Sequence, residues 1–267
     1  MPHPFRFGVT AMPVPGQGPW PDVARAVEAA GFHRLFLPEN HPLPDGMTSA
    51  GVALGATVTL EVGTFVLASP LHDPRHVAWQ AHSLATTSGG RFRFGIGTGR
   101  PDVAADAEAL GVPFGTGSER LARVAATLDA LDAADGSGPH TPVLVAAGGP
   151  KALRLAADRA DTIALAISPG ATPDEAEAIT SALPDRVEIA SSIFAIGDDV
   201  PPFARHFLGP HADGLAERDS LAWLPGDPDD LCAKLIERRD RFGISCFTVS
   251  SELMDAMAPA VQRLRDR

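Results

Sequence analysis

The chain has 267 residues, 45% hydrophobic and 21% charged, a composition typical of a globular protein with a sizeable core. Its formal net charge of −11 disfavours a nucleic-acid partner, and the one basic cluster, Arg238-Arg239 with Arg241, is expected on a solvated helix face. No run approaches the roughly 18 apolar residues of a membrane helix, so no membrane partner is expected.

Short apolar runs alternate with helical patterns along the first half of the chain. These runs predict strands over 5–9, 35–37, 62–67 and 92–96. Helical spacing of apolar residues, with proline near the start or glycine past the end, predicts helices over 21–30, 54–58 and 74–85.

The same alternation continues to the end of the chain. Strands are predicted over 143–146, 163–167, 187–196 and 246–249, helices over 118–131 and 150–160, and further helices centred on 176–179, 231–236 and 254–261. Strands separated by helices imply parallel pairing, and eight such units close into a barrel. The glycine-rich segment 135–139 is too short to separate two domains. We therefore expect a single (β/α)8 TIM barrel domain over residues 1–267.

The two cysteines, Cys232 and Cys246, form no C-x-x-C pair, and a lone disulfide would be unusual in a protein of this size. The N-terminus lacks the basic and apolar segments of a signal peptide. Both observations favour a cytoplasmic location.

The residues that follow the predicted strands are the first candidates for a functional site, because barrel enzymes hold their active sites there. They are rich in glycine and hydroxyl groups, with one carboxylate, one histidine and one arginine: Thr10, Glu39, His41, Ser69, Thr98, Gly99, Arg100, Ala147, Gly148, Gly149, Ser168, Ser191 and Ser250. Such a rim suits a phosphate-bearing cofactor held by backbone N–H groups and hydroxyls. Simple turn formation is the alternative interpretation.

Three motifs narrow the choice of chemistry. Ala147-Gly148-Gly149-Pro150-Lys151 leads from a strand into a helix and predicts an anion site at the helix N-terminus. Gly95-x-Gly97-x-Gly99 has the wrong spacing for a dinucleotide fingerprint, and Arg100-Pro101 follows in place of a helix start. A metal site is not expected, because Asp73-Pro74 places His72 before a helix and His76 inside it, with no third ligand nearby.

Four stretches of the chain resemble the luciferase-like monooxygenase superfamily, which includes deazaflavin (coenzyme F420) dependent reductases and FMN-dependent monooxygenases. They are 31–39, 62–67, 88–99 and 146–151. The resemblance spans nearly the whole chain, and the S-G-G-R-F segment leading to G-x-G-x-G is its most specific part.

The resemblance implies a flavin-type ring in the mouth of the barrel, backed by a non-prolyl cis peptide bond between Phe65 and Val66. The residues that it implies for cofactor binding are Asn40, Phe65, Val66, Thr98, Gly99, Arg100, Ala147, Gly148, Gly149 and Ser250. Hydride would move to or from the ring, and the protein would supply a proton donor beside it.

The sequence departs from the family where that proton donor is expected. Relatives read acid-histidine or Glu-His-His after the second strand, whereas this chain reads Glu39-Asn40-His41. An asparagine forms hydrogen bonds but does not shuttle a proton near neutral pH. Glu39 and His41 are therefore the expected catalytic residues, with Glu39 acting as an acid if burial raises its pKa.

Coenzyme F420-dependent hydride transfer to or from a small organic substrate is the leading hypothesis. The alternatives are an FMN-dependent monooxygenase, a cofactor-binding barrel without turnover, and an isomerase or lyase acting on a phosphorylated metabolite. The short stretch 132–141 indicates an open mouth. A homodimer is expected by analogy with relatives.

Overall fold

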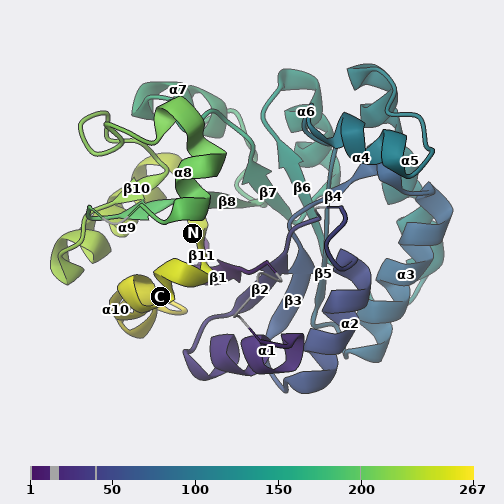
Figure 1. Ribbon diagram of the computed structural model, residues 1–267, viewed down its shortest axis with the longest axis horizontal. Helices are drawn as coiled ribbons and strands as arrows, with labels where there is room; N and C mark the ends of the chain where they lie inside the picture. Colours follow the sequence, from purple (N-terminus) through teal and green to yellow (C-terminus); the bar gives the residue numbers. More distant parts are fainter. Residues whose placement is uncertain (1, 13–17, 40, 199) are drawn as a thin grey trace.

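The computed structural model describes residues 2–12, 18–39, 41–198 and 200–267, and its strands form a closed parallel barrel with helices around it (Figure 1). The sheet order is β3-β2-β1-β11-β8-β7-β6-β5-β4, and an additional pairing of β3 with β5 closes the ring. The expected (β/α)8 TIM barrel is thereby confirmed.

The barrel strands are short, and most of them lie where the apolar runs predicted them. They are β1 (Arg6–Thr10), β2 (Arg34–Leu37), β3 (Glu61–Thr64), β4 (Leu67–Ala68), β5 (Phe92–Gly97), β6 (Val143–Ala147), β7 (Thr162–Leu165), β8 (Glu188–Ile193) and β11 (Ile244–Ser250). The predicted strand 62–67 is divided into β3 and β4, and the predicted strand 187–196 into β8 and β9 (Ala195–Ile196). β9 leaves the barrel and pairs with β10 (Trp223–Leu224).

The helices cover the outside of the barrel (Figure 1). They are α1 (Trp20–Ala29), α2 (Gly46–Ala56), α3 (Pro74–Thr87), α4 (Val103–Ala109), α5 (Gly117–Asp135), α6 (Pro150–Arg159), α7 (Pro173–Thr180), α8 (Pro202–Leu208), α9 (Pro228–Phe242) and α10 (Met254–Leu264). Short 3-10 turns occupy η1 (Ser69–Leu71), η2 (Gly209–His211) and η3 (Ser251–Leu253). In the part of the chain that the structure describes, no helix is both long and apolar enough to cross a membrane.

Two helix starts explain how the elements near the site are held. The Asp73 carboxylate accepts hydrogen bonds from the first backbone N–H groups of α3, which is why His72 lies just outside that helix. Thr116 and Glu119 form a capping box at the start of α5, two residues earlier than the sequence pattern indicated.

The core has three parts, the third being a small cluster that joins α8 to the β9–β10 pair. Apolar residues between the sheet and the helices make up the largest one, and a small cluster fills the inside of the barrel. Inside the barrel, Phe36 and Leu144 are the bulky residues, and Ala164 and Ala190 surround them. Such small neighbours let one aromatic ring fill the centre at normal packing density.

Three expectations from the sequence were wrong. Arg238 is only 1% exposed rather than on a solvated face, and its guanidinium donates to the carbonyls of Ser220, Leu221 and Trp223. Burial lowers its pKa to about 10. A helix, α4, does follow Arg100-Pro101 after one intervening residue, and the helix expected over 54–58 instead ends at Ala56.

Candidate functional site

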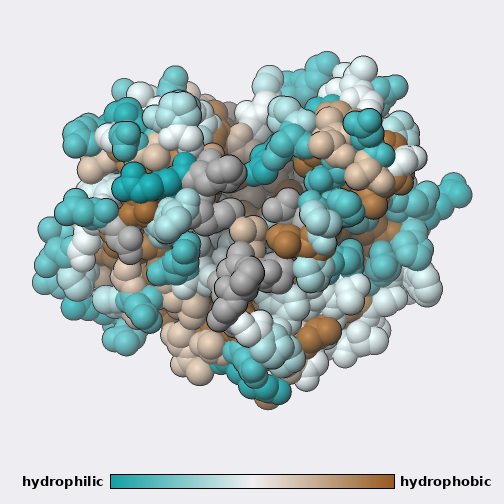
Figure 2. Space-filling model, in the orientation of Figure 1, coloured by the Kyte–Doolittle hydropathy of each residue, from teal (hydrophilic) through white to brown (hydrophobic). Residues whose placement is uncertain are grey.

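The carboxyl ends of the strands meet at one end of the barrel, called the mouth below. This face of the molecule is hollowed at its centre (Figure 2). Every site residue expected from the sequence lies on the loops or strand ends at the mouth, except Asn40, which falls outside the described residues. The barrel topology thus gathers these residues at one end from five different strand ends.

A non-prolyl cis peptide bond joins Phe65 and Val66, as the resemblance implied. It lies between β3 and β4, and the Thr64 hydroxyl donates to the Gly95 carbonyl (2.7 Å) and accepts from the Gly95 N–H (2.9 Å). A Cβ at Gly95 would lie 1.8 Å from the Thr64 carbonyl oxygen. The first glycine of the G-x-G-x-G motif is therefore required for this close approach of two strands rather than for a phosphate.

The floor of the mouth is apolar. Phe65, Val66 and Ala146 are partly buried and pack on the cluster inside the barrel. The rings of Phe36 and Phe65 are 4.9 Å apart at an angle of 41°. A planar aromatic ligand could rest on such a surface without desolvating a charged group.

The two glycines after β6 have different surroundings. Ala147 is buried, and a Cβ at Gly148 would lie 2.0 Å from the Ala166 carbonyl oxygen. Gly149 is exposed, caps α6 without a side-chain partner, and has no atom within 4 Å of where its Cβ would be. Gly148 is thus needed for packing against the next loop, whereas Gly149 leaves the N-terminal N–H groups of α6 open to a ligand.

Ser250 is the last residue of β11 and lies opposite Thr10 of β1. Its Oγ is buried and has no hydrogen-bond partner within the described part of the chain. A buried hydroxyl without a partner costs stability. Such an atom at the mouth is a candidate donor to a bound ligand.

Glu39, the expected catalytic acid, has two hydrogen-bond partners. One carboxylate oxygen accepts from the Ala68 N–H (2.7 Å), and the other lies 2.6 Å from Nε2 of His72. The Glu39 and His72 side chains are 13% and 18% exposed. His41 is exposed and precedes a cis bond to Pro42. His72 is the residue that sequence reasoning missed, because only its spacing to His76 was considered.

Two arginines of α5 fix the loops on this side of the mouth. Arg120 donates to the Thr98 carbonyl (2.9 Å), and Arg123 donates to the carbonyls of Ser69 (3.2 Å) and His72 (2.5 Å). Thr98 is therefore positioned through its backbone carbonyl. The role of its hydroxyl in cofactor binding stays a prediction. Gly99 follows with a φ of +76°, a conformation that favours glycine.

Arg100 is exposed and pairs with Asp102, its Nε lying 3.1 Å from the carboxylate. Its guanidinium also lies 4.9 Å from the ring centroid of Phe207 in α8, which stacks on Phe194. Arg100 thus joins the loop after β5 to α8.

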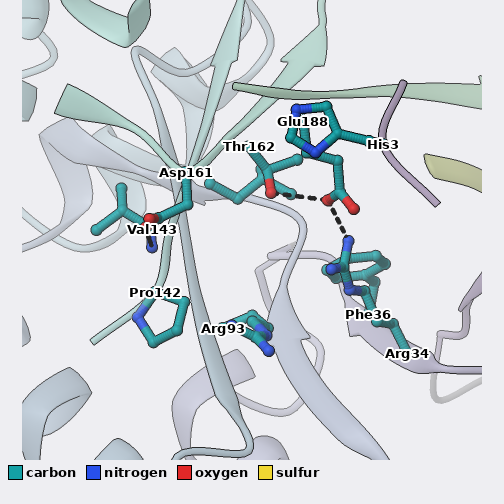
Figure 3. Close-up of a pocket in the computed structure, with 10 residues that line it drawn as sticks. His3, Arg34, Phe36, Arg93, Pro142, Val143, Asp161, Thr162 and Glu188 are labelled. Carbon is teal, nitrogen blue, oxygen red and sulfur yellow. Dashed lines mark hydrogen bonds and ion pairs between the residues drawn. The ribbon is translucent and has the colours of Figure 1, made fainter. Parts of the chain in front are cut away.

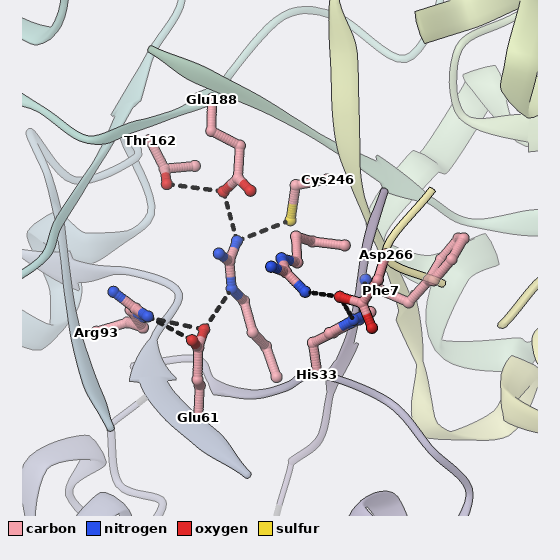
Figure 4. A network of polar contacts seen from close by, with 10 residues as sticks. Phe7, His33, Glu61, Arg93, Thr162, Glu188, Cys246 and Asp266 are labelled. Carbon is pink, nitrogen blue, oxygen red and sulfur yellow. Dashed lines mark hydrogen bonds and ion pairs between the residues drawn. The ribbon is translucent and has the colours of Figure 1, made fainter. Parts of the chain in front are cut away.

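The opposite end of the barrel, called the base below, is closed by a base network of Arg34, Glu61, Arg93, Thr162, Glu188 and Cys246 (Figure 4). Arg34 donates to Glu61 (2.8 Å) and to Glu188 (2.5 Å), and Arg93 donates to Glu61 (2.9 Å). Although burial alone would raise it, the two guanidinium groups hold the pKa of Glu61 at about 2. Burial raises the pKa of the Cys246 thiol to about 12, so this cysteine is not a reactive thiolate.

A cavity of about 180 Å³ also opens at the base (Figure 3). Its charged lining is already partnered among the described residues: Arg34 and Arg93 as above, Asp161 by the Val143 N–H (2.7 Å) and His140 (2.8 Å), and His3 by the Asp185 carbonyl (2.8 Å). Each of these charged side chains already has at least one partner in the described part of the chain. The mouth, and not this cavity, is the candidate site.

No group of three or more potential metal-ligating side chains occurs within residues 2–12, 18–39, 41–198 and 200–267. His72 is engaged by Glu39, and His76 faces the Trp79 ring at 5.8 Å.

Comparison with known proteins identifies the family. The family model described as luciferase-like monooxygenase matches residues 6–201. An uncharacterised protein of Mycobacterium tuberculosis is 34% identical over a segment that covers 37% of this chain and 42% of that protein. The match therefore spans less than half the length of that relative.

Solved structures share the fold at low sequence identity. The coenzyme F420-dependent tetrahydromethanopterin reductase of Methanopyrus kandleri superposes with a TM-score of 0.73 at 17% identity, covering 98% of each chain. Riboflavin lyase, solved with modified FMN and riboflavin, superposes with a TM-score of 0.69 at 13% identity, covering 97% of this chain and 90% of that one.

Proposed function

We propose that this chain, which belongs to the luciferase-like monooxygenase family, is an oxidoreductase that uses coenzyme F420 for hydride transfer to or from a small organic substrate. The observation that carries the proposal is the unpartnered, buried Ser250 hydroxyl at the mouth, the end of the barrel that also holds the open N-terminus of α6. A phosphate-bearing cofactor would complete both groups.

The residues of the mouth fit a deazaflavin or flavin. Phe65, Val66 and Ala146 offer an apolar floor for a ring system, and Gly149 leaves space for an anion next to α6. Ser250, and by analogy Thr98, would donate hydroxyl hydrogen bonds to the polar tail. Ala147 and Gly148 would shape the loop behind the polar tail of the cofactor. Gly99 and Arg100 would shape the opposite side of the mouth.

When bound, a deazaflavin supplies or accepts a hydride, and the protein must handle the accompanying proton. The residues of this chain would hold the ring against the Phe65–Val66 segment, keep water from it, and present a proton donor from the loops after β2 and β4. The Ala-Gly-Gly-Pro-Lys segment, the Gly99-Arg100-Pro101 sequence and the compact chain favour F420 over FMN.

Parallel titrations with F420 and FMN, followed by absorbance and fluorescence, test this function. We expect saturable F420 binding in the micromolar range and weaker binding of FMN. Tight FMN binding without F420 affinity would point instead to an FMN-dependent monooxygenase. Binding of neither would contradict the proposal and favour an isomerase or lyase.

We also propose that one domain carries the whole activity, that the working form is a homodimer and that the protein is cytoplasmic. The buried, unpaired Cys232 and Cys246 support a reducing compartment.

Val52 of α2 and Trp79 of α3 are 45% and 63% exposed, and such apolar side chains suit a subunit interface. Analytical ultracentrifugation of the wild type and of Trp79→Asp would show a dimer that the variant weakens.

A further inference from the structure

The contact between Glu39 and His72 joins the end of β2 to the residue after η1, across 33 positions of the sequence. One oxygen of the Glu39 carboxyl group accepts from the Ala68 N–H, and the other lies 2.6 Å from Nε2 of His72; when Glu39 is ionised, both oxygens accept. A carboxylate that accepts from two donors has no proton to give. Glu39 is therefore poorly arranged to be the acid that the sequence suggested.

The same geometry defines the hydrogen positions on the His72 ring. An ionised carboxylate only accepts hydrogen bonds, so the hydrogen of the neutral ring lies on Nε2. Nδ1 has no partner in the described part of the chain. The His72 side chain is 18% exposed, so the ring is not sealed from solvent. The atom of this pair that can exchange a proton is Nδ1 of His72.

We propose that His72 is the proton-exchanging residue of the mouth and that Glu39 is the residue that positions it. The inference deepens the proposed function and rests on it. In the reductive direction, the substrate atom that becomes negative after hydride addition takes the proton from Nδ1, and the imidazolium becomes neutral imidazole. In the oxidative direction, neutral Nδ1 takes the proton back. His72 thereby supplies the function of the histidine that Asn40 replaces.

The backbone around His72 is rigid enough for this role. Arg123 donates to the His72 carbonyl, and the next residue, Asp73, caps α3. The charged groups near the ring are Glu39 from the end of β2, Asp73 from the start of α3, and Arg120 and Arg123 from α5. The two arginines bind backbone carbonyls, so Glu39 is the only one of these groups in contact with the ring itself.

Nuclear magnetic resonance of protein labelled with ¹⁵N-histidine tests the pair without requiring turnover. His72→Gln assigns the signal, and His76→Gln, four residues further along and outside the site, is the matched control. We expect the Nε2–H tautomer for His72 in the wild type, and a mixture of tautomers in Glu39→Gln. Saturation with the cofactor that binds, F420 or FMN, should move the Nδ1 resonance of His72 and leave that of His76 in place.

Kinetics of the loaded enzyme provide the second measurement. His72→Gln should lower turnover by about 100-fold or more while changing the cofactor Kd less than twofold. Glu39→Gln should lower turnover less than His72→Gln does, since the ring keeps its place but loses its fixed orientation, and His76→Gln should match the wild type. Wild-type turnover in His72→Gln, or an Nδ1 resonance unmoved by bound cofactor, overturns this inference alone. The titrations show separately whether either cofactor binds. If neither F420 nor FMN binds, the proposed function and this inference are both overturned.

Discussion

At the base of the barrel, each charged side chain of the base network touches an opposite charge, whereas at the mouth the Ser250 hydroxyl is buried without a partner among the described residues. The base holds two guanidinium groups against two carboxylates, and the mouth holds one paired carboxylate, a partly exposed imidazole and an open helix N-terminus. A fully partnered set of buried charges contributes to stability and specificity, while unpartnered groups are retained where a ligand completes them. The comparison favours the mouth over the cavity at the base as the candidate functional site.

Removing one charged side chain from the base network should have the largest effect on stability. Arg34→Met leaves the Glu61 and Glu188 carboxylates without their shared partner, and we expect a loss of about 3–5 kcal/mol, or on the order of 10 °C in Tm. Arg25→Met, which removes an exposed pair with Asp22, is the control and should cost less than about 1 kcal/mol. Calorimetry measures both. Cofactor affinity of folded Arg34→Met should equal that of the wild type; a large loss of affinity would mean that the two ends are coupled.

The base network should also make a large contribution to the loss of folding stability at low pH. Folding lowers the pKa of Glu61 from 4.5 to about 2, so its stabilising contribution is complete above its unfolded value and is lost as the pH falls through about 2. Glu61→Gln should therefore be less stable than the wild type by about 3 kcal/mol at pH 7, with the difference closing between pH 4.5 and 2. Urea unfolding at several pH values measures the gap. A gap that persists unchanged at pH 2 would contradict the assignment.

Variants of Gly148 and Gly149, the two glycines after β6, test packing and cofactor binding at the mouth separately. Gly148→Ala places a methyl group against the Ala166 carbonyl and should cost about 1–3 kcal/mol. Gly149→Ala has room for its methyl group, so its stability should match the wild type while its cofactor affinity falls, because the methyl group stands where an anion would approach α6. Thermal unfolding and the cofactor titration, run on both variants, distinguish the two roles. Unchanged affinity in Gly149→Ala would remove this glycine from the site.

The smallest expected effect distinguishes two unpartnered serines on one strand. Ser250 ends β11 at the mouth and Ser245 lies near its start at the base, and both hydroxyls are buried without partners among the described residues. Ser250→Ala should weaken cofactor binding by about tenfold, the value of a hydrogen bond of roughly 1.4 kcal/mol, with no loss of stability. Ser245→Ala should leave affinity unchanged. Equal affinities in both variants would show that Ser250 does not contact the cofactor.

Much of the fold could be predicted from the sequence, because the spacing of apolar residues and the residues that start and end helices are local properties of the chain. The alternation of Phe5, Phe7 and Val9 and the helix start at Asp73-Pro74 depend on neighbours within a few residues. The excursion that carries α8 and the β9–β10 pair was not predictable in this way, since Arg238 holds it through backbone carbonyls 15 to 18 residues away.

The sequence by itself determined the barrel and the end of it at which the candidate site lies, because strand order and loop position follow from the chain pattern, and the family resemblance pointed to the cis bond between Phe65 and Val66. Only the tertiary structure decided what those residues touch. It assigned Gly95 and Gly148 to close backbone packing, and it brought His72 to Glu39. The physical reason is that hydrogen bonds and steric limits act between atoms within a few ångströms, while these partners are 18 to 33 residues apart in the chain.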